Sequence, residues 1–279
     1  MKEVILKQLS TIHGLKSTVT KRVWDHAHPV REIDLDKFDQ KGDELTEDNI
    51  QKRTELLANR LIKEYPDANP VLIGLMDGAL PFASLLQTKL NEKGYQYSYT
   101  TMQASSYGNK TTTSGELKIA SMPKIPLGGR TVFVIDDVCD TGNTYLKIRE
   151  LLESFGPKKI SLVVLVDKVQ KRVDNYMPEY VVFEVPSTAF IVGMGLDYFG
   201  ELRNKLEIRA VDPLSLPNEQ ELELLNSEAS LNEQLRKEIA LEKTARPGSS
   251  NITIFGGSLE QSIKPDALED QQVITTTYQ

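Results

Sequence analysis

One short segment of the chain, residues 132–144, carries the side chains best suited to chemistry. It reads Val-Phe-Val-Ile-Asp-Asp-Val-Cys-Asp-Thr-Gly-Asn-Thr, an apolar run that ends in two carboxylates, a third carboxylate and a small-residue turn. A turn that opens a helix points free backbone N–H groups at one spot, where the helix dipole favours an anion. Gly142 allows close approach of the backbone, and Thr141 and Thr144 add hydroxyl groups. The segment therefore predicts a phosphate-binding loop.

The carboxylates beside this loop narrow the choice of ligand. Asp136, Asp137 and Asp140 would repel a bare phosphate, so the ligand should also carry hydroxyl groups or a divalent cation for the carboxylates to hold. A sugar phosphate together with Mg²⁺ meets both requirements. For this segment alone, a buried strand that ends in a solvated acidic turn remains the alternative.

Residues 132–144 resemble the phosphoribosyl-diphosphate (PRPP) motif of the type I phosphoribosyltransferases. The resemblance implies that Asp136 and Asp137 hold the ribose hydroxyls, directly or through Mg²⁺, and stabilise positive charge at the anomeric carbon. It implies that Asp140 accepts a proton at purine N7. The 5-phosphate would be bound by the loop residues Asp140, Thr141, Gly142, Asn143 and Thr144.

A second polar segment, residues 105–119, follows a stretch in which Tyr95, Tyr97 and Tyr99 alternate as they would in a strand. Alone, residues 105–119 predict a mobile hairpin loop. Beside the first motif they resemble the closing loop of the hypoxanthine-guanine branch of the family. In that branch a Ser-Tyr pair, here Ser106 and Tyr107, covers the pyrophosphate, and such a lid keeps water from a reactive ribosyl cation.

A third group of residues resembles the purine-binding part of the same branch. Lys168 corresponds to a donor to the purine 6-oxo group, and Phe190 to an aromatic ring that stacks on the base. Without the resemblance, Lys168 would be a solvated strand end and Phe190 an ordinary core residue. The resemblance also implies base-edge contacts by the backbone of Ile191 and Val192, a place near the purine 2-position or a second Mg²⁺ for Asp197, and pyrophosphate binding by Arg203.

The loop at residues 73–82 departs from the family pattern. Asp77, followed by Gly78, stands where the family's pyrophosphate loop usually has the lysine of Leu-Lys-Gly. A carboxylate that faces pyrophosphate costs energy unless Mg²⁺ intervenes or the side chain turns away. Residues 186–189, before Phe190, also run one residue longer than the family's usual Pro-Asp. The preference among hypoxanthine, guanine and xanthine therefore stays open.

Composition excludes several other classes of function. The 279 residues are 39% hydrophobic with a net charge of −7, which allows a globular core and argues against nucleic-acid binding. The single cysteine, Cys139, excludes an internal disulfide and a multi-cysteine zinc site. His26 and His28 could form a metal pair, but no further cluster of ligands lies nearby in the sequence, which favours a solvated loop. No apolar run reaches the ~18–20 residues of a membrane span, so we expect a cytoplasmic protein.

The elements between residues 44 and 212 must position these side chains. Strand-like runs at 71–75, 131–135 and 161–166 alternate with helical patterns at 81–90 and 145–155, and Thr46 predicts the N-cap of an earlier helix. Such alternation predicts an α/β fold, a mainly parallel twisted sheet flanked by helices, with its ligand at the carboxyl ends of the strands. The resemblance adds a small hood above that edge.

We expect three zones along the chain. Residues 1–43 are polar and mixed in charge and predict a loosely packed N-terminal extension; residues 44–212 form the phosphoribosyltransferase domain. Residues 213–279 form a helical or disordered C-terminal extension. Capping patterns at Asn218–Glu221 and Ser230–Glu233 predict one helix or a helix pair, followed by a break at residues 246–250 and a poorly ordered end.

The resemblance thus implies a purine-salvage enzyme. It would transfer the 5-phosphoribosyl group from PRPP to N9 of hypoxanthine or guanine, with Mg²⁺ as cofactor, giving IMP or GMP and pyrophosphate. A homo-oligomer, dimer or tetramer, is the expected assembly. Two alternatives remain: a non-catalytic sensor of PRPP or nucleotides, which Asp77 and the long tail would suit, and a scaffold whose tail binds a partner.

Overall fold

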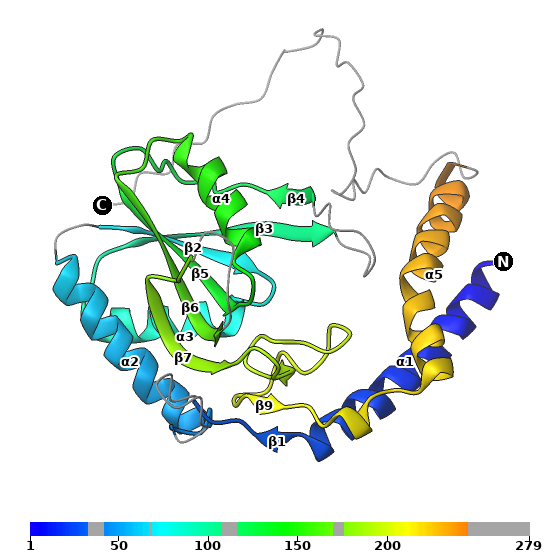
Figure 1. Cartoon of the computed structure of the whole chain (residues 1–279). Coiled ribbons are helices and arrows are strands. Elements are labelled where there is room, and N and C mark those ends of the chain that lie inside the picture. Colours follow the sequence, from blue (N-terminus) through cyan, green and yellow to red (C-terminus); the bar gives the residue numbers. More distant parts are fainter. Residues whose placement is uncertain (33–41, 67–68, 108–115, 170–175, 245–279) are drawn as a thin grey trace, which may run out of the picture.

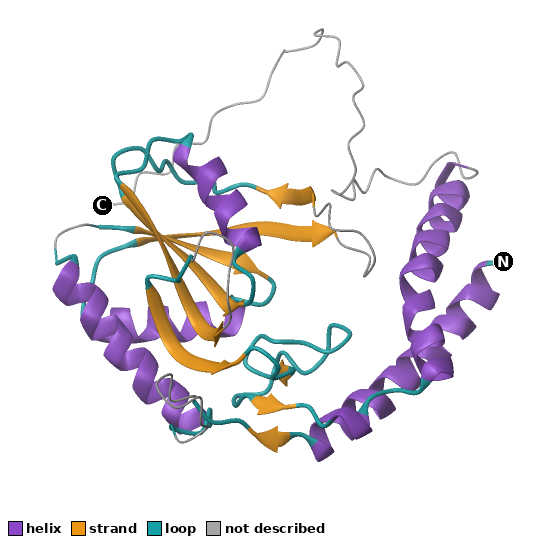
Figure 2. Ribbon diagram, in the orientation of Figure 1, coloured by secondary structure: helices purple, strands orange, loops and turns teal. Residues whose placement is uncertain are grey.

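The protein is seen in a computed structural model that describes residues 1–32, 42–66, 69–107, 116–169 and 176–244 (Figures 1 and 2). Its centre is a six-stranded sheet with the strand order β4-β3-β2-β5-β6-β7. Five neighbouring strands are parallel, and β4 at the edge pairs antiparallel with β3. The strands are β2 (Val71–Met76), β3 (Ser98–Tyr107), β4 (Glu116–Ser121), β5 (Thr131–Cys139), β6 (Lys159–Val169) and β7 (Tyr180–Pro186).

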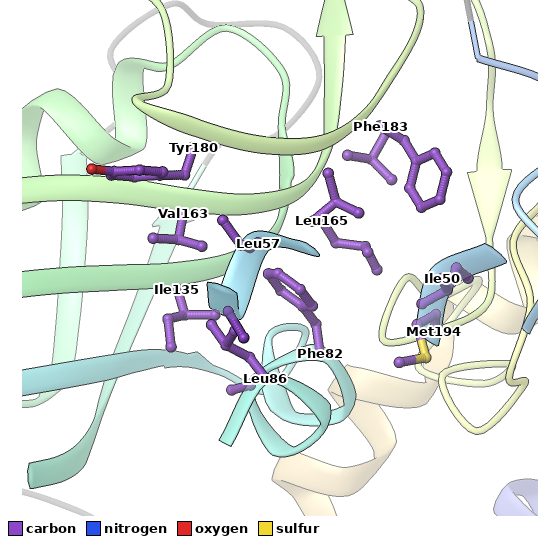
Figure 3. Close-up of a cluster of buried hydrophobic side chains, with 14 of the residues drawn as sticks. Ile50, Leu57, Phe82, Leu86, Ile135, Val163, Leu165, Tyr180, Phe183 and Met194 are labelled. Atoms are coloured by element: carbon purple, nitrogen blue, oxygen red, sulfur yellow. The ribbon is translucent and has the colours of Figure 1, made fainter. Parts of the chain in front are cut away.

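Alternating apolar residues send side chains to both faces of this sheet. In β5, Phe133 and Ile135 join the cluster under the helices α2 (Glu47–Glu64) and α3 (Leu80–Glu92), while Val132 and Val134 join the cluster under α4 (Asn143–Glu153). Figure 3 shows the first cluster, in which Phe82 and Leu86 lie close to Ile135. The predicted α/β fold with a mainly parallel sheet covered by helices is confirmed.

Local sequence signals explain where several helices begin. Thr46 is the N-cap of α2, and its hydroxyl accepts a hydrogen bond from the Asn49 N–H at 3.4 Å. In α5 (Glu219–Thr244), Asn218 and Glu221 form a reciprocal capping box, with both hydrogen bonds at 3.0 Å. The helix continues through Ser230–Glu233, so of the two alternatives, one helix or a helix pair, the structure has the single helix. Inside a continuing helix, a capping pattern has no free N–H groups to satisfy.

Other strand boundaries differ from the prediction. β3 begins only at Ser98, so Tyr95 and Tyr97 precede the strand, and Tyr95 instead donates its hydroxyl to the Tyr65 carbonyl at 2.6 Å. β5 runs past Ile135 through the acidic pair to Cys139. The predicted break at residues 246–250 and the end of the chain lie outside the described residues. No helix in the described part is long and apolar enough to cross a bilayer.

A second, small sheet forms the hood. Its three two-residue strands are β1 (His28–Pro29), β8 (Ile191–Val192) and β9 (Arg209–Ala210), in the order β1-β9-β8 and all antiparallel. The central strand, β9, pairs on one side with β1 from the N-terminal extension and on the other with β8 from the predicted purine-binding segment. The N-terminal extension is therefore part of the hood.

The expectation of a loosely packed N-terminal extension is wrong for the described residues 1–32. Residues Lys2–His26 form one long helix, α1, which lies beside α5 on the side of the molecule away from α2 (Figure 1). Its buried apolar residues are spaced by four, three, seven and four positions, so that Ile5, Leu9, Ile12, Val19 and Val23 lie on one stripe. Because polar residues such as Thr and Lys lie between them, the composition of this segment did not reveal the apolar stripe.

Candidate active site

The carboxyl ends of β2 and β5 and the loop after β8 enclose a cavity of about 530 Å³. Its lining includes both predicted ribose residues, Thr144 of the phosphate loop, and three of the predicted pyrophosphate residues. A second cavity of about 210 Å³ lies beside it, under the phosphate loop, and shares Asp136, Asp137 and Thr144 with the first. The large cavity is lined by Leu75, Met76, Asp77, Gly78, Gln103, Ala104, Ala120, Asp136, Asp137, Thr144, Asp197 and Arg203.

The phosphate loop has the geometry that its residues predict. β5 ends at Cys139, α4 begins at Asn143, and Gly142 between them has a φ of 79°, in the left-handed region that favours glycine. Thr141 accepts a hydrogen bond from the Asn143 N–H at 3.4 Å. The first turn of α4 thus starts at the smaller cavity, where backbone N–H groups and the helix dipole favour an anion.

Asp136 and Asp137 sit where positive charge would stabilise them. Burial, with the charge of Asp137 and their hydrogen bond, raises the pKa of Asp136 well above its usual range. Burial also raises the pKa of Asp137, against the opposing effects of hydrogen bonds and of Arg203. The Asp137 N–H donates to Asp136 Oδ1 at 3.0 Å, and the Val138 N–H donates to Asp137 Oδ1 at 2.8 Å. These bonds fix both carboxyl groups at the cavity.

Two glycines hold the loops of the site in close contact. A Cβ on Gly78 would lie 2.2 Å from Asp137 Oδ2, and a Cβ on Gly195 would lie 2.0 Å from the Gly78 carbonyl oxygen. Gly195 also has a φ of 101°. Asp137, the loop after β2 and the loop after β8 are therefore stacked at distances that only glycine permits.

Lys168 and Asp140 come together from different strands. Lys168, near the end of β6, has a side chain only 15% exposed, and its Nζ lies 3.8 Å from Asp140 Oδ2 at the phosphate loop. A strand-end lysine that is largely covered and faces a carboxylate is unlike a solvated strand end. The pair places a cation and a proton acceptor side by side beside the phosphate loop.

Three of the predicted base-binding residues lie in the hood strand β8 or directly before it. Phe190 is 43% exposed and lies edge-to-face with Tyr198, with ring centroids 5.7 Å apart and planes at 67°. Ile191 and Val192 are buried and pair with Ala210 and Arg209. Their side chains belong to the core, which leaves the backbone as the part that a ligand could contact.

Asp197 and Arg203 form an ion pair at the cavity. Arg203 Nη2 lies 2.7 Å from Asp197 Oδ1, and Arg203 Nη1 donates to the Gly195 carbonyl. Asp197 Oδ2 accepts the Gly200 N–H at 2.6 Å. The arginine is thereby aimed at the carboxylate end of the site, as its effect on the pKa of Asp137 also shows.

The structure shows the position of some of the remaining predicted residues and only the backbone of others. Asp77 and Gly78 line the large cavity, with Asp77 following β2 directly. Ser106 and Tyr107 end β3, which pairs with β4 as a hairpin, but their side chains lie outside the described part of the structure. Sequence reasoning missed Gly195, Gln103, Ala104 and Ala120; the Gly193-Met-Gly195 spacing was a usable signal for Gly195, whereas the other three carry none.

The donor set fits Mg²⁺ as a cation shared with a substrate. Within the described ranges, no three Asp, Glu, His or Cys side chains gather closely enough to hold a metal ion by themselves. Two partly buried carboxyl groups with raised pKa values would be stabilised in their ionised form by a divalent cation. Mg²⁺ is commonly bound by one or two carboxylates together with substrate phosphates, which is the arrangement that this cavity allows.

Comparison with known proteins now identifies the family. The model of the phosphoribosyl transferase domain matches residues 42–198. The chain belongs to the phosphoribosyl transferase family. The hypoxanthine-guanine phosphoribosyltransferase of Bacillus subtilis is 37% identical over 169 residues, which make up 61% of this chain and 92% of that protein. The Streptococcus pyogenes enzyme of the same name is 33% identical over 159 residues, 57% of this chain and 86% of that protein.

Solved structures give the same family. A hypoxanthine phosphoribosyltransferase from Staphylococcus aureus superposes with a TM-score of 0.58 at 32% identity, covering 62% of this chain and 92% of that one. The resemblance to the hypoxanthine-guanine branch that residues 132–144 and 165–204 indicated is confirmed. The family match ends before β9 and α5 and begins after α1, so this phosphoribosyltransferase carries helices outside the matched region.

Proposed function

We propose that this phosphoribosyltransferase joins the phosphoribosyl group of PRPP to N9 of hypoxanthine or guanine, in purine salvage, and releases pyrophosphate. The observation that carries the proposal is the approach of Lys168 to Asp140 beside the phosphate loop. A 6-oxopurine offers an acceptor at O6 and a proton at the neighbouring N7, and these two side chains complement that edge. Adenine has an amino group at the same position and would face the lysine with a donor.

The chain's own residues divide the reaction between them. The amides of residues 140–144 bind the 5-phosphate and fix the ribose. Asp136 and Asp137 face the ribose and stabilise the positive charge that develops at C1 as its bond to pyrophosphate breaks. Purine N9 forms the new bond to C1, and Asp140 accepts the proton from N7. Phe190 stacks on the base, with Lys168 donating to O6.

Pyrophosphate is the group that the other half of the cavity would bind. Arg203, held by Asp197, offers a guanidinium to the departing anion. Mg²⁺, held by Asp136 and Asp137 with Asp197 as a separate candidate ligand, would supply charge neutralisation of pyrophosphate when bound. Asp77 lines the same space and makes the cavity more dependent on that neutralisation. Ser106 and Tyr107 are the residues that we propose as the lid over the pyrophosphate.

The test is pyrophosphate release from PRPP and Mg²⁺ with hypoxanthine, guanine, xanthine and adenine in parallel. We expect release with 6-oxopurines and not with adenine. Replacing Lys168 by Gln should lower kcat/KM for hypoxanthine by about 10- to 100-fold, the cost of a lost hydrogen bond from a charged donor. Lys158→Gln, an exposed lysine just before β6, is the matched control and should leave the rate unchanged. Equal rates for all four bases would contradict the role of Lys168.

The sensor remains the second candidate because Asp77 replaces a cation in the pyrophosphate loop. A sensor would bind PRPP, raising the melting temperature, without releasing pyrophosphate with any base. We also infer a cytoplasmic homo-oligomer, a dimer or tetramer, because closed symmetric assemblies are common among soluble enzymes. Light scattering coupled to gel filtration measures that state directly.

A further inference from the structure

The helices outside the family match form an arm of defined geometry. In this arm, α1 and α5 run antiparallel and side by side (Figure 1). Ion pairs join them along their length: Lys2 to Glu242 at 2.6 Å, Lys16 to Glu228 at 3.1 Å and Arg22 to Glu221 at 2.8 Å. Charges at successive levels of a helix pair fix its register. The end of the arm near Arg22 and Glu221 is the end that meets the hood.

The arm and the hood share one buried cluster. Val19 and Val23 of α1 and Leu225 of α5 pack with Val192 of β8 and with Leu202 of the following loop. Tyr198 and Phe199, from the same loop, pack against this cluster and against each other, with ring centroids 4.9 Å apart. The loop that contains Asp197 and Arg203 is therefore backed by the arm.

A single aromatic side chain makes a second connection. Trp24 of α1 has two cations over its ring, Lys205 Nζ and Arg209 Cζ, each 4.7 Å from the centroid. Arg209 lies in β9 and pairs with Val192 on one side and with Pro29 on the other. Trp24 thus contacts β9, the strand that pairs with β8, and the backbone of β8 is the part predicted to contact the base.

The backbone of the loop needs such support. Met194, Phe199 and Leu202 have φ values of 49°, 52° and 70°, and residues with side chains adopt this left-handed region at a cost. Such conformations persist where surrounding packing determines them. For Phe199 and Leu202, that packing comes from the cluster shared with α1 and α5.

We propose that the arm is a positioning element for the purine half of the active site, acting through Tyr198. Tyr198 lies between the arm cluster and Phe190, whose ring it meets edge-to-face. Arg22, fixed by Glu221 and by the Ser215 carbonyl, interacts electrostatically with Tyr198. The inference rests on the proposed function, in which Phe190 stacks on the base. It assigns to α1 and α5 a role in purine affinity. PRPP depends less on this loop, because its 5-phosphate is bound by residues 140–144 and only its pyrophosphate meets Arg203.

The test separates the KM for hypoxanthine from the KM for PRPP and from kcat. Tyr198→Leu removes the ring that supports Phe190, and Trp24→Ala removes the contact with Lys205 and Arg209. Each should raise the hypoxanthine KM roughly two- to ten-fold, the range to which the energy of one aromatic pair converts, with a smaller change in the PRPP KM. Tyr198→Phe and Trp24→Phe keep an aromatic ring and should restore most of the affinity.

Ile5→Ala is the matched control in the arm. Ile5 is as buried as the cluster residues, at 3% exposed, but lies near the other end of α1 and outside the shared cluster. It should weaken the arm and leave the hypoxanthine KM unchanged. An equal rise in this variant would overturn the route through Trp24 and Tyr198. If Trp24→Ala fails to fold, the Tyr198 pair decides the question.

A direct binding measurement removes the dependence on turnover. Calorimetric titration with GMP should give a dissociation constant weakened in Tyr198→Leu by the same factor as the hypoxanthine KM, while the dissociation constant for PRPP should change by a smaller factor. Unchanged GMP binding and unchanged hypoxanthine KM in folded Tyr198→Leu would overturn the inference. Failure of the wild-type chain to turn over any purine would instead overturn the proposed function, so the two failures are distinguishable.

Discussion

Replacing Gly78 by alanine would put a methyl group into the space of the Asp137 carboxylate. The new Cβ would lie 2.2 Å from Oδ2, whereas ordinary contacts begin at 3.4 Å, so the two groups must separate by about 1 Å. The loop cannot withdraw on its other side, because the Gly78 carbonyl already meets Gly195 at a distance that excludes a side chain there. The carboxylate of Asp137 must therefore move.

The cost of that movement can be estimated. A displacement of about 1 Å in a catalytic group lowers the rate by about 10²-fold, which is about 2.7 kcal/mol in the activation free energy. Moving the carboxylate also strains its hydrogen bond from the Val138 N–H. We expect Gly78→Ala to lose about 10²-fold in kcat/KM for hypoxanthine, measured by pyrophosphate release, with a much smaller change in melting temperature.

A double variant shows whether the loss acts through Asp137. Asp137→Ala removes the carboxylate that the new methyl group would displace, so adding Gly78→Ala to it should cost little more. Gly128→Ala, whose Cβ would lie 3.6 Å from the Phe155 carbonyl, is the glycine control and should be neutral. Wild-type kcat/KM in Gly78→Ala, or fully additive losses in the double variant, would refute the reasoning.

Three further outcomes are expected. Asp140→Asn should cut turnover by about 10²-fold or more while PRPP binding, measured by calorimetry, stays nearly intact, because an amide cannot accept the N7 proton; a near-wild-type rate would contradict the assignment. Arg22 donates a hydrogen bond to Glu221 and thereby lowers the pKa of this carboxyl group. Its stabilising contribution to the arm is therefore complete above the unfolded-state pKa of about 4.5 and is lost as the pH falls through the lowered native pKa. Melting curves of wild type and Glu221→Gln should therefore converge on acidification; a constant gap would contradict this. Gly14→Ala, in the middle of α1 with open space at the Cβ, should stabilise the helix by about 1 kcal/mol, read as slower amide exchange in α1; unchanged exchange would argue against a helix there.

The central domain could be predicted because its signals are local. The apolar runs of β2, β5 and β6 cover enough residues to show a buried strand, and the turn at Gly142 follows from its neighbours in the chain. Lys168 and Asp140 belong to such local motifs, and the parallel order of β5 and β6 then brings them together.

The hood and the arm could not be predicted in the same way. Strands of two residues, such as β1 and β9, are too short to show any periodicity. The apolar stripe of α1 is interrupted by Lys16, whose ion-pair partner Glu228 lies more than two hundred residues later in the chain. The contact of Gly78 with Asp137 and Gly195 likewise depends on three separate loops, and no spacing along the chain encodes it.

The antiparallel pairing of α1 with α5 also has a consequence for synthesis. α1 is made first, and its partner is made only after the whole central domain, since Lys2 and Glu242 are separated by 240 positions. During translation, the apolar stripe of α1 has no helix to cover it while the sheet is assembling. The strand β1 must wait in the same way for β9.

The residues of the phosphate loop and of the central sheet are therefore synthesised before β9, which completes the hood. The residues that would bind the ribose and the 5-phosphate are thus synthesised before β9 and α5, and α1 is covered only once α5 has been made. Chains that stop short of α5 would leave α1 exposed as a target for chaperones and proteases. Exposure of the apolar stripe of α1 thus distinguishes chains that lack α5 from chains that contain it.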